Sequence, residues 1–205
     1  MKLILPTFLL LSAMLLSACS MSPIVKNIRF DNVSYDAEKR KTVVTAINST
    51  DQFKIRELTD TIMGLGPNID REEASFVARE AGLYPKHLAT KYNLIAPPNS
   101  HNVLVNTGKR DRGLCYHWAH DMPDHIVADR TFKTLTLQRA VANQGRNYEH
   151  NVLTVAAKGK GIENAFILDA WRNSSDLYVV QTRDDPIYDW KKYKRRTYSS
   201  VPVTY

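Results

Sequence analysis

The spacing of apolar residues changes near Thr131, and this change restricts the folds open to the chain. Over 49–128 the apolar residues recur at helical intervals, whereas over 132–137 they alternate with polar residues as in a half-buried strand. Helices followed by an antiparallel sheet are typical of an α+β domain. With no internal repeat and no sign of a second core, 49–205 is expected to form one domain of this class.

Individual elements follow from turn and cap residues. A first helix begins near Ser49 and stops at 64–67, where glycine and proline occur. A second begins at the cap residue Asp70, with Glu73 completing a capping box, and ends at Gly82. A third is expected over 85–92.

The second half predicts a meander of strands. The segments 152–157 and 165–168 are expected to pair as a hairpin around Lys158-Gly-Lys-Gly161, and 178–181 adds another strand. Between the two halves, a helix is expected over 116–122, with Pro123 kinking or restarting it and 125–128 continuing it.

The first 18 residues are typical of a secretory signal peptide. Lys2 precedes an apolar segment over 3–16, and small residues lead up to Cys19. Leu16-Ser17-Ala18-Cys19 resembles a bacterial lipobox, which implies that Cys19 is lipidated and becomes the mature N-terminus. The alternative is an ordinary signal peptide with Cys19 there by chance. Residues 19–48 then form a lipidated tether leading into one or two short elements.

The lipobox resemblance implies a place and a partner. Ser20 after the cysteine, rather than aspartate, implies the outer membrane, with the domain facing the periplasm of a bacterial envelope. The net charge is +7, and removal of Lys2 with the signal peptide lowers it by one. The basic run at 191–196 is a solvated end or a contact for anionic lipid. Nucleic acid is not an expected partner, because no basic face studded with aromatic residues is present.

Cys115 is the second of two cysteines and has no disulfide partner if Cys19 carries lipid. A lone thiol in an oxidising compartment is either buried as a small apolar side chain or used chemically. Cys115 follows a glycine-containing loop and is expected in the first turn of a helix. The N–H groups and dipole there stabilise a thiolate, and the same N–H groups can bind an oxyanion.

His150 and Asp169 supply the remaining groups of a thiol triad. His150 opens one predicted strand of the hairpin, and Asp169 follows the other. Such strands bring side chains into register, so that Asp169 can hold one ring nitrogen while the other faces Cys115. A cysteine nucleophile needs such a base and such an orienting group.

These residues resemble a family. The pattern Gly113-x-Cys-aromatic-x-Trp-Ala119, the histidine at a strand start and Leu168-Asp-x-Trp171 are similar to the transglutaminase-like branch of the papain-like cysteine proteases. The resemblance covers 113–173. It implies a papain-like or transglutaminase-like α+β fold in which Cys115 is the nucleophile, His150 the base and Asp169 the orienting residue. The aromatic residue or glutamine that completes the family's oxyanion hole has no clear counterpart.

Other histidines and acids offer alternatives. Cys115, His117 and His120 have a spacing that suggests a metal, but residues two apart do not share a helix face and zinc needs a fourth ligand. His117 and His120 are therefore expected to pack or form hydrogen bonds. Asp121 and Asp124 compete with Asp169 as the orienting residue but lie on the helix of Cys115 itself.

The expected function is thiol-dependent attack on an amide or ester carbonyl by a peptidase, amidase or acyl transferase, with no cofactor and no metal. Its substrate would be a protein, a peptide or a cell-wall component. The alternative is a non-catalytic lipoprotein that uses the same fold to bind an envelope partner or polymer. The two differ in whether Cys115 is a reactive or an inert thiol.

Overall fold

The computed structural model describes residues 26–29, 34–36, 41–43, 49–128 and 130–194. The predicted signal segment and Cys19 lie outside these residues, as does part of the predicted tether. The described chain is α+β, with helices preceding most of an antiparallel sheet, so the predicted fold class is confirmed. None of the helices in the described ranges has the length and apolar content needed to span a bilayer.

The helices are α1 (Ser49–Met63), α2 (Arg71–Lys91), α3 (Pro98–Asn106) and α4 (Cys115–Val127). The six-stranded sheet has the order β1 (Lys26–Ile28), β7 (Asp176–Gln181), β6 (Phe166–Asn173), β5 (His150–Ala157), β4 (Leu135–Ala142) and β8 (Lys191–Lys192). Strands β2 (Ser34–Asp36) and β3 (Lys41–Val43) form a separate antiparallel pair. β1 pairs with β7 and so brings the start of the described chain to one edge of the sheet.

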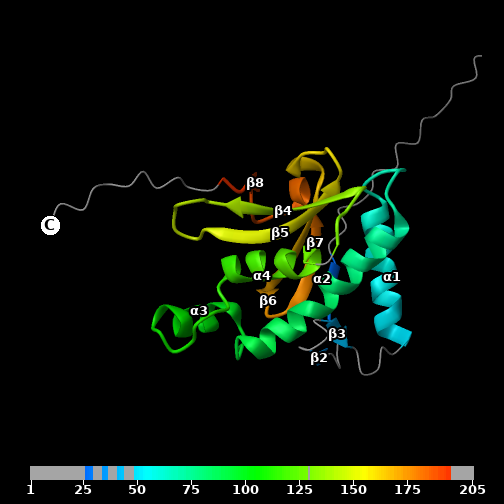
Figure 1. Ribbon diagram of the computed structural model, residues 1–205. Helices are drawn as coiled ribbons and strands as arrows, with labels where there is room; N and C mark the ends of the chain where they lie inside the picture. The colour runs from blue at the N-terminus through cyan, green and yellow to red at the C-terminus, as the bar shows by residue number, and fades with distance from the viewer. Residues whose placement is uncertain (1–25, 30–33, 37–40, 44–48, 129, 195–205) are drawn as a thin grey trace, which may run out of the picture.

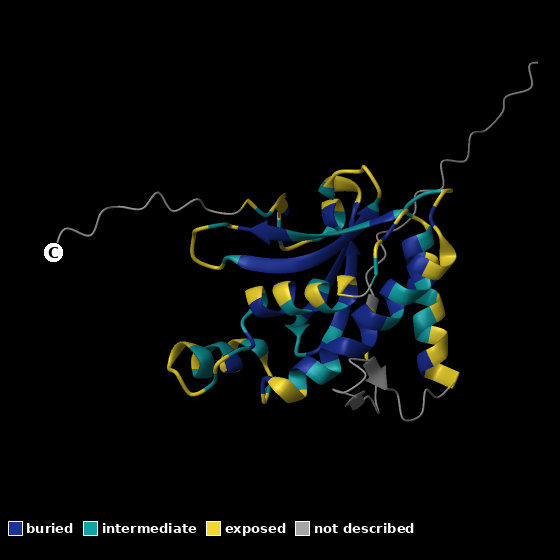
Figure 2. Cartoon of the chain, viewed as in Figure 1, coloured by how far each residue is buried: buried dark blue, intermediate teal, exposed yellow. Residues whose placement is uncertain are grey.

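The helices cover one face of the sheet (Figure 1). α4 packs on β5, and α2 packs on β7 and on α1. The main apolar core lies between these helices and the sheet and includes Leu58, Trp118, Leu153 and Phe166. A smaller cluster contains Val152, Ile167 and Val180 from the strands and Trp190 from the segment before β8. The central strands are buried, whereas exposed residues gather in the connecting loops and on outer helix surfaces (Figure 2).

The prediction that a helix ends at Gly82 is wrong. α2 continues through Gly82 and Pro85 to Lys91, so two predicted helices form one. Residues 81–85 are all buried, and packing against the core outweighs the low helix propensity of glycine and proline. Glycine and proline are therefore better markers of a helix end at the surface than inside the core.

The cap at the start of α2 differs in part from the predicted capping box. Asp70 accepts a hydrogen bond from the N–H of Glu73 at 2.9 Å, as expected. The carboxylate of Glu73, however, accepts from the backbone N–H groups of Lys133 (2.6 Å) and Thr134 (2.9 Å). Glu73 therefore ties the start of α2 to the segment that enters β4.

The predicted hairpin is confirmed. Leu153 lies opposite Leu168 and Val155 opposite Phe166 in antiparallel register. The connection is longer than a tight turn, because a short 3-10 helix over Ile162–Asn164 follows the two glycines. β4 runs antiparallel to β5, and Ala142 lies opposite His150 at the end of their ladder.

Candidate active site

Cys115 is the first residue of α4. Leu114 before it has an extended backbone, and Gly113 has a φ of +123°, a conformation that favours glycine. A Cβ atom built on Gly113 would lie 2.2 Å from Nε2 of His101, so glycine is also required by the close approach of that ring. Because Cys115 begins the helix, its backbone N–H lies among the groups that have no acceptor within the helix.

Two histidine rings hold the loop in front of Cys115. Buried His101 accepts a hydrogen bond from the N–H of Ile95 at Nδ1 (3.3 Å) and donates from Nε2 to the carbonyl of Arg112 (2.9 Å). The ring therefore connects the residues preceding α3 to the loop preceding α4. The sequence did not predict a role for His101, and in the structure its ring supports the loop before Cys115.

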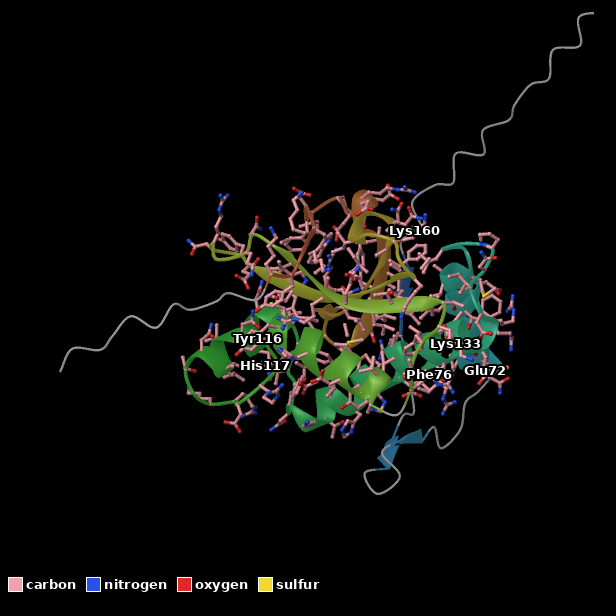
Figure 3. The ribbon with its side chains drawn as sticks, turned by 45° about the horizontal axis from the view of Figure 1, so that its top comes forward. Glu72, Phe76, Tyr116, His117, Lys133 and Lys160 are labelled. Carbon is pink, nitrogen blue, oxygen red and sulfur yellow. The ribbon has the colours of Figure 1, made fainter. Side chains whose placement is uncertain are left out.

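His117 supports the same loop from within α4. Its Nδ1 accepts hydrogen bonds from the N–H groups of Gly113 and Leu114, both at 3.1 Å. Burial and the positive charge of Arg112 lower the pKa of His117 to about 4, which keeps this nitrogen free to accept. Figure 3 shows Tyr116 and His117 together at the start of α4, away from Phe76 and Lys133 at the other end of the helix layer.

His150 and Asp169 form a buried pair. The imidazole Nε2 of His150 lies 2.7 Å from Oδ2 of Asp169, and the two side chains are 2% and 1% exposed. His150 is the first residue of β5, and Asp169 lies in β6. Since a carboxylate accepts, Nε2 carries the proton in this bond and leaves Nδ1 available as the second functional atom of the ring.

Cys115 lies beside the start of β5. Its Sγ is 3.8 Å from the carbonyl oxygen of Glu149, the residue that precedes His150. Nδ1 of His150 is buried, and none of the described residues lies at the distance and angle of a hydrogen bond to it. Cys115 and His150 line the same cavity, and His150 contacts Asp169, so the three predicted triad residues are brought to one place.

The pKa of His150 reflects two opposed effects. Burial lowers it, but the charge and hydrogen bond of Asp169, together with the interaction with Cys115, raise the pKa of His150 to about 9. Burial likewise raises the pKa of Asp169, but the charge and hydrogen bond of His150 and the charge of Arg172 hold it below its ordinary value. At neutral pH the ring is positively charged and the carboxylate negatively charged.

Asp169 is held by more than His150. Its Oδ1 accepts from the backbone N–H groups of Trp171 (3.0 Å) and Arg172 (3.1 Å), and its Oδ2 accepts from Nε of Arg172 at 3.1 Å. Arg172 in turn pairs with Asp185 at 2.7 Å. The carboxylate is therefore fixed in position, and the sequence-based triad did not include Arg172 or Asp185.

Aromatic rings enclose His150. The ring centroids of Trp171 and Tyr188 each lie 4.8 Å from that of His150, and the centroid of Trp190 lies 5.4 Å away. Tyr188 and Trp190 come from an irregular segment near the end of the described chain. Only the clustering of aromatic and acidic residues over 184–190 could have suggested that this segment takes part.

Cys115 and His150 open onto a cavity of about 310 Å³. Its lining combines polar, charged and aromatic side chains from α3, from the loop before β5, from β6 and from the segment after β7. The lining residues are Pro98, Asn99, Asn102, Cys115, Tyr148, Glu149, His150, Trp171, Arg172 and Tyr188. The thiol and the imidazole thus line the same cavity.

Asp121 and Asp124, the alternatives to Asp169 from the sequence, contact other residues than His150. Asp121 accepts hydrogen bonds from Tyr92 (2.8 Å) and Arg112 (2.5 Å), and Asp124 lies 3.9 Å from Nδ1 of His120. Within the described ranges, no group of three or more histidine, cysteine or acidic side chains is placed to hold a metal ion. Asp169 is thus the acid that contacts His150.

No protein-family model matches the chain, and comparison with curated proteins and with solved structures likewise finds no match.

Proposed function

We propose that this protein is a thiol enzyme of the transglutaminase-like, papain-like type that attacks an amide or ester carbonyl. The observation that carries the proposal is the buried His150–Asp169 pair, 2.7 Å apart, beside a cysteine at the first position of a helix. Cys115 would be the nucleophile and His150 the base, with Asp169 orienting and stabilising the imidazolium. The adjoining cavity gives room for a substrate chain segment.

Several features suit this chemistry. A charged His150 next to Cys115 suits a cysteine nucleophile, because a neighbouring imidazolium is one of the features of reactive thiols. After attack, the same ring can return its proton to the leaving amine or alcohol. The aromatic rings around His150 exclude water and strengthen these interactions.

The proposal is tested by acylation with p-nitrophenyl acetate. Attack of the Cys115 sulfur on the ester carbonyl forms a thioester and releases p-nitrophenolate, which is followed by absorbance. We expect a burst with one acetyl group on Cys115, located by peptide mass spectrometry, and no burst in Cys115→Ser or His150→Ala. A wild-type protein that releases p-nitrophenolate no faster than Cys115→Ser would contradict the proposal.

A second candidate, a binding module with an inert thiol, is favoured by one contact. Sγ of Cys115 lies 3.8 Å from the carbonyl of Glu149, and only a neutral thiol can donate to that oxygen. In this case the cavity would hold an envelope polymer or partner without reaction. Loss of the acylation burst together with retained structure would support it.

We also propose that the protein is anchored in the bacterial envelope through lipid on Cys19, facing the periplasm from the outer membrane. The signal-like segment and Leu16-Ser-Ala-Cys19 support this. Cys19→Ala should stop labelling by a palmitate analogue and either release the protein from membranes or leave the precursor uncleaved. Unchanged labelling and fractionation would contradict the anchor.

A further inference from the structure

Asn102 of α3 lies in the wall of the cavity that contains Cys115 and His150. It comes from a part of the chain where no site residue was predicted. Its amide is oriented, because Nε1 of Trp171 donates to Oδ1 of Asn102 at 3.3 Å. An indole N–H can only donate, so the amide oxygen faces Trp171 and the two N–H donors of Asn102 face elsewhere.

The same tryptophan belongs to the triad's surroundings. Its backbone N–H donates to Asp169, and its ring lies 4.8 Å from His150. The position of the Asn102 amide is thereby coupled to the groups that position the imidazole. The backbone N–H of Cys115 supplies a second donor without an acceptor in the helix.

We infer that Asn102 is the side-chain donor of the oxyanion site, acting together with the backbone N–H of Cys115; this rests on the proposed thiol-enzyme function. When the sulfur attacks a carbonyl, the C–S bond forms and the carbonyl π electrons move to oxygen. The Asn102 amide and the helix N–H donate to that negative oxygen. Its collapse expels the alcohol or amine and leaves a thioester on Cys115.

The experiment compares two reactions of the same thiol in the full-length, detergent-solubilised protein. p-Nitrophenyl acetate reacts through a tetrahedral oxyanion, whereas iodoacetamide reacts by displacement of iodide at a saturated carbon and forms none. The ratio of the two rates therefore reports oxyanion stabilisation independently of how much of Cys115 is thiolate. Asn102→Ala should lower this ratio about 100-fold.

Asn102→Asp separates catalysis from support. Aspartate can still accept from the Trp171 indole but offers no N–H, so the ratio should fall at least as far as in Asn102→Ala. If Asn102 only held Trp171 in place, aspartate would restore the ratio. Asn106→Ala, which removes an exposed asparagine from the end of the same helix, is the matched control and should leave the ratio unchanged.

Two results would overturn the inference. One is a ratio in Asn102→Ala equal to that of the wild type, and the other is recovery of the ratio in Asn102→Asp. Tyr188→Phe tests the competing hydroxyl donor in the same wall, and a selective loss there with none in Asn102→Ala would assign the oxyanion to Tyr188. Failure of the wild type to acylate Cys115 at all would instead reject the proposed function on which the inference rests.

Discussion

Asp169 carries a negative charge that is almost fully enclosed, and its hydrogen bonds explain how that charge is tolerated. His150 and Arg172 neutralise it, and two backbone N–H groups saturate Oδ1. This arrangement fixes the tautomer of His150 with the proton on Nε2. Nδ1 is then the ring nitrogen left for proton exchange with a thiol or a leaving group, as the proposed mechanism requires.

Asp169→Asn tests the role of the Asp169 carboxylate, because it replaces one carboxylate oxygen by an amide nitrogen. The neutral amide removes the negative charge that stabilises the imidazolium, and its N–H can donate to Nε2, which leaves a neutral ring beside the thiol. We expect acylation of Cys115 by p-nitrophenyl acetate at pH 7 to fall by about 100-fold or more, and alkylation by iodoacetamide to fall less. Equal acylation rates in Asp169→Asn and the wild type would contradict the assigned tautomer.

His117 makes the stability of the folded protein depend on pH. Its folded-state pKa of about 4 lies below its ordinary value of 6.5, so its contribution is complete above pH 6.5 and is lost as pH falls toward 4. Urea titrations at pH 7 and pH 4.5 should show a smaller acid-induced loss in His117→Ala than in the wild type. The difference between the two proteins isolates His117 from carboxylates, which titrate in the same range. An identical acid-induced loss in both proteins would show that His117 does not cap the loop as described.

At the scale of elements, Glu73 joins α2 to the entry of β4. Removing its charge weakens two hydrogen bonds from the backbone of Lys133 and Thr134. Glu73→Gln should therefore lower the free energy of unfolding by about 1–3 kcal/mol, measured by urea denaturation. Glu72 is adjacent on α2, and its side chain is 83% exposed, so Glu72→Gln is the matched control and should change stability by less than about 0.5 kcal/mol. Equal losses in the two variants would contradict the proposed tie; Figure 3 shows where Glu72 and Lys133 lie.

Elements with local signals could be predicted from sequence, and those that depend on distant packing could not. Alternation and two glycines located the β5–β6 hairpin, and Asp70 located the start of α2. Gly82 misled because burial of its neighbours outweighs its preference for helix ends. β1 and β8 are three and two residues long and are strands only because β7 and β4 pair with them.

At the scale of the whole molecule, some residues of the candidate site could be predicted from the sequence and others could not. Cys115, His150 and Asp169 were predicted from residue chemistry and chain order, and a helix start and neighbouring strands do place them near one another. Asn102 and Arg172 carry no comparable signal. They reach the cavity only because α3 and the end of β6 pack around it, and this packing depends on contacts between segments about 70 residues apart.

The central claim concerns the charge state shared by Cys115 and His150. With the pKa of His150 raised to about 9, the imidazolium is present throughout the neutral range, and the proposed thiol enzyme uses this charge to activate Cys115. His150→Ala removes this charge and leaves a thiol that must ionise by itself, near pH 8.5 for an ordinary cysteine. His120→Ala, an exposed histidine on α4, is the matched control.

The most direct measurement is the rate of Cys115 alkylation by iodoacetamide from pH 5 to 10 in the wild type, His150→Ala and His120→Ala. The wild type and His120→Ala should react at nearly constant rates between pH 6 and 8. His150→Ala should react about 100-fold more slowly at pH 6.5 and recover only near pH 8.5. A wild-type rate that rises tenfold per pH unit to an ordinary thiol midpoint, or a profile that His150→Ala leaves unchanged, would contradict the account.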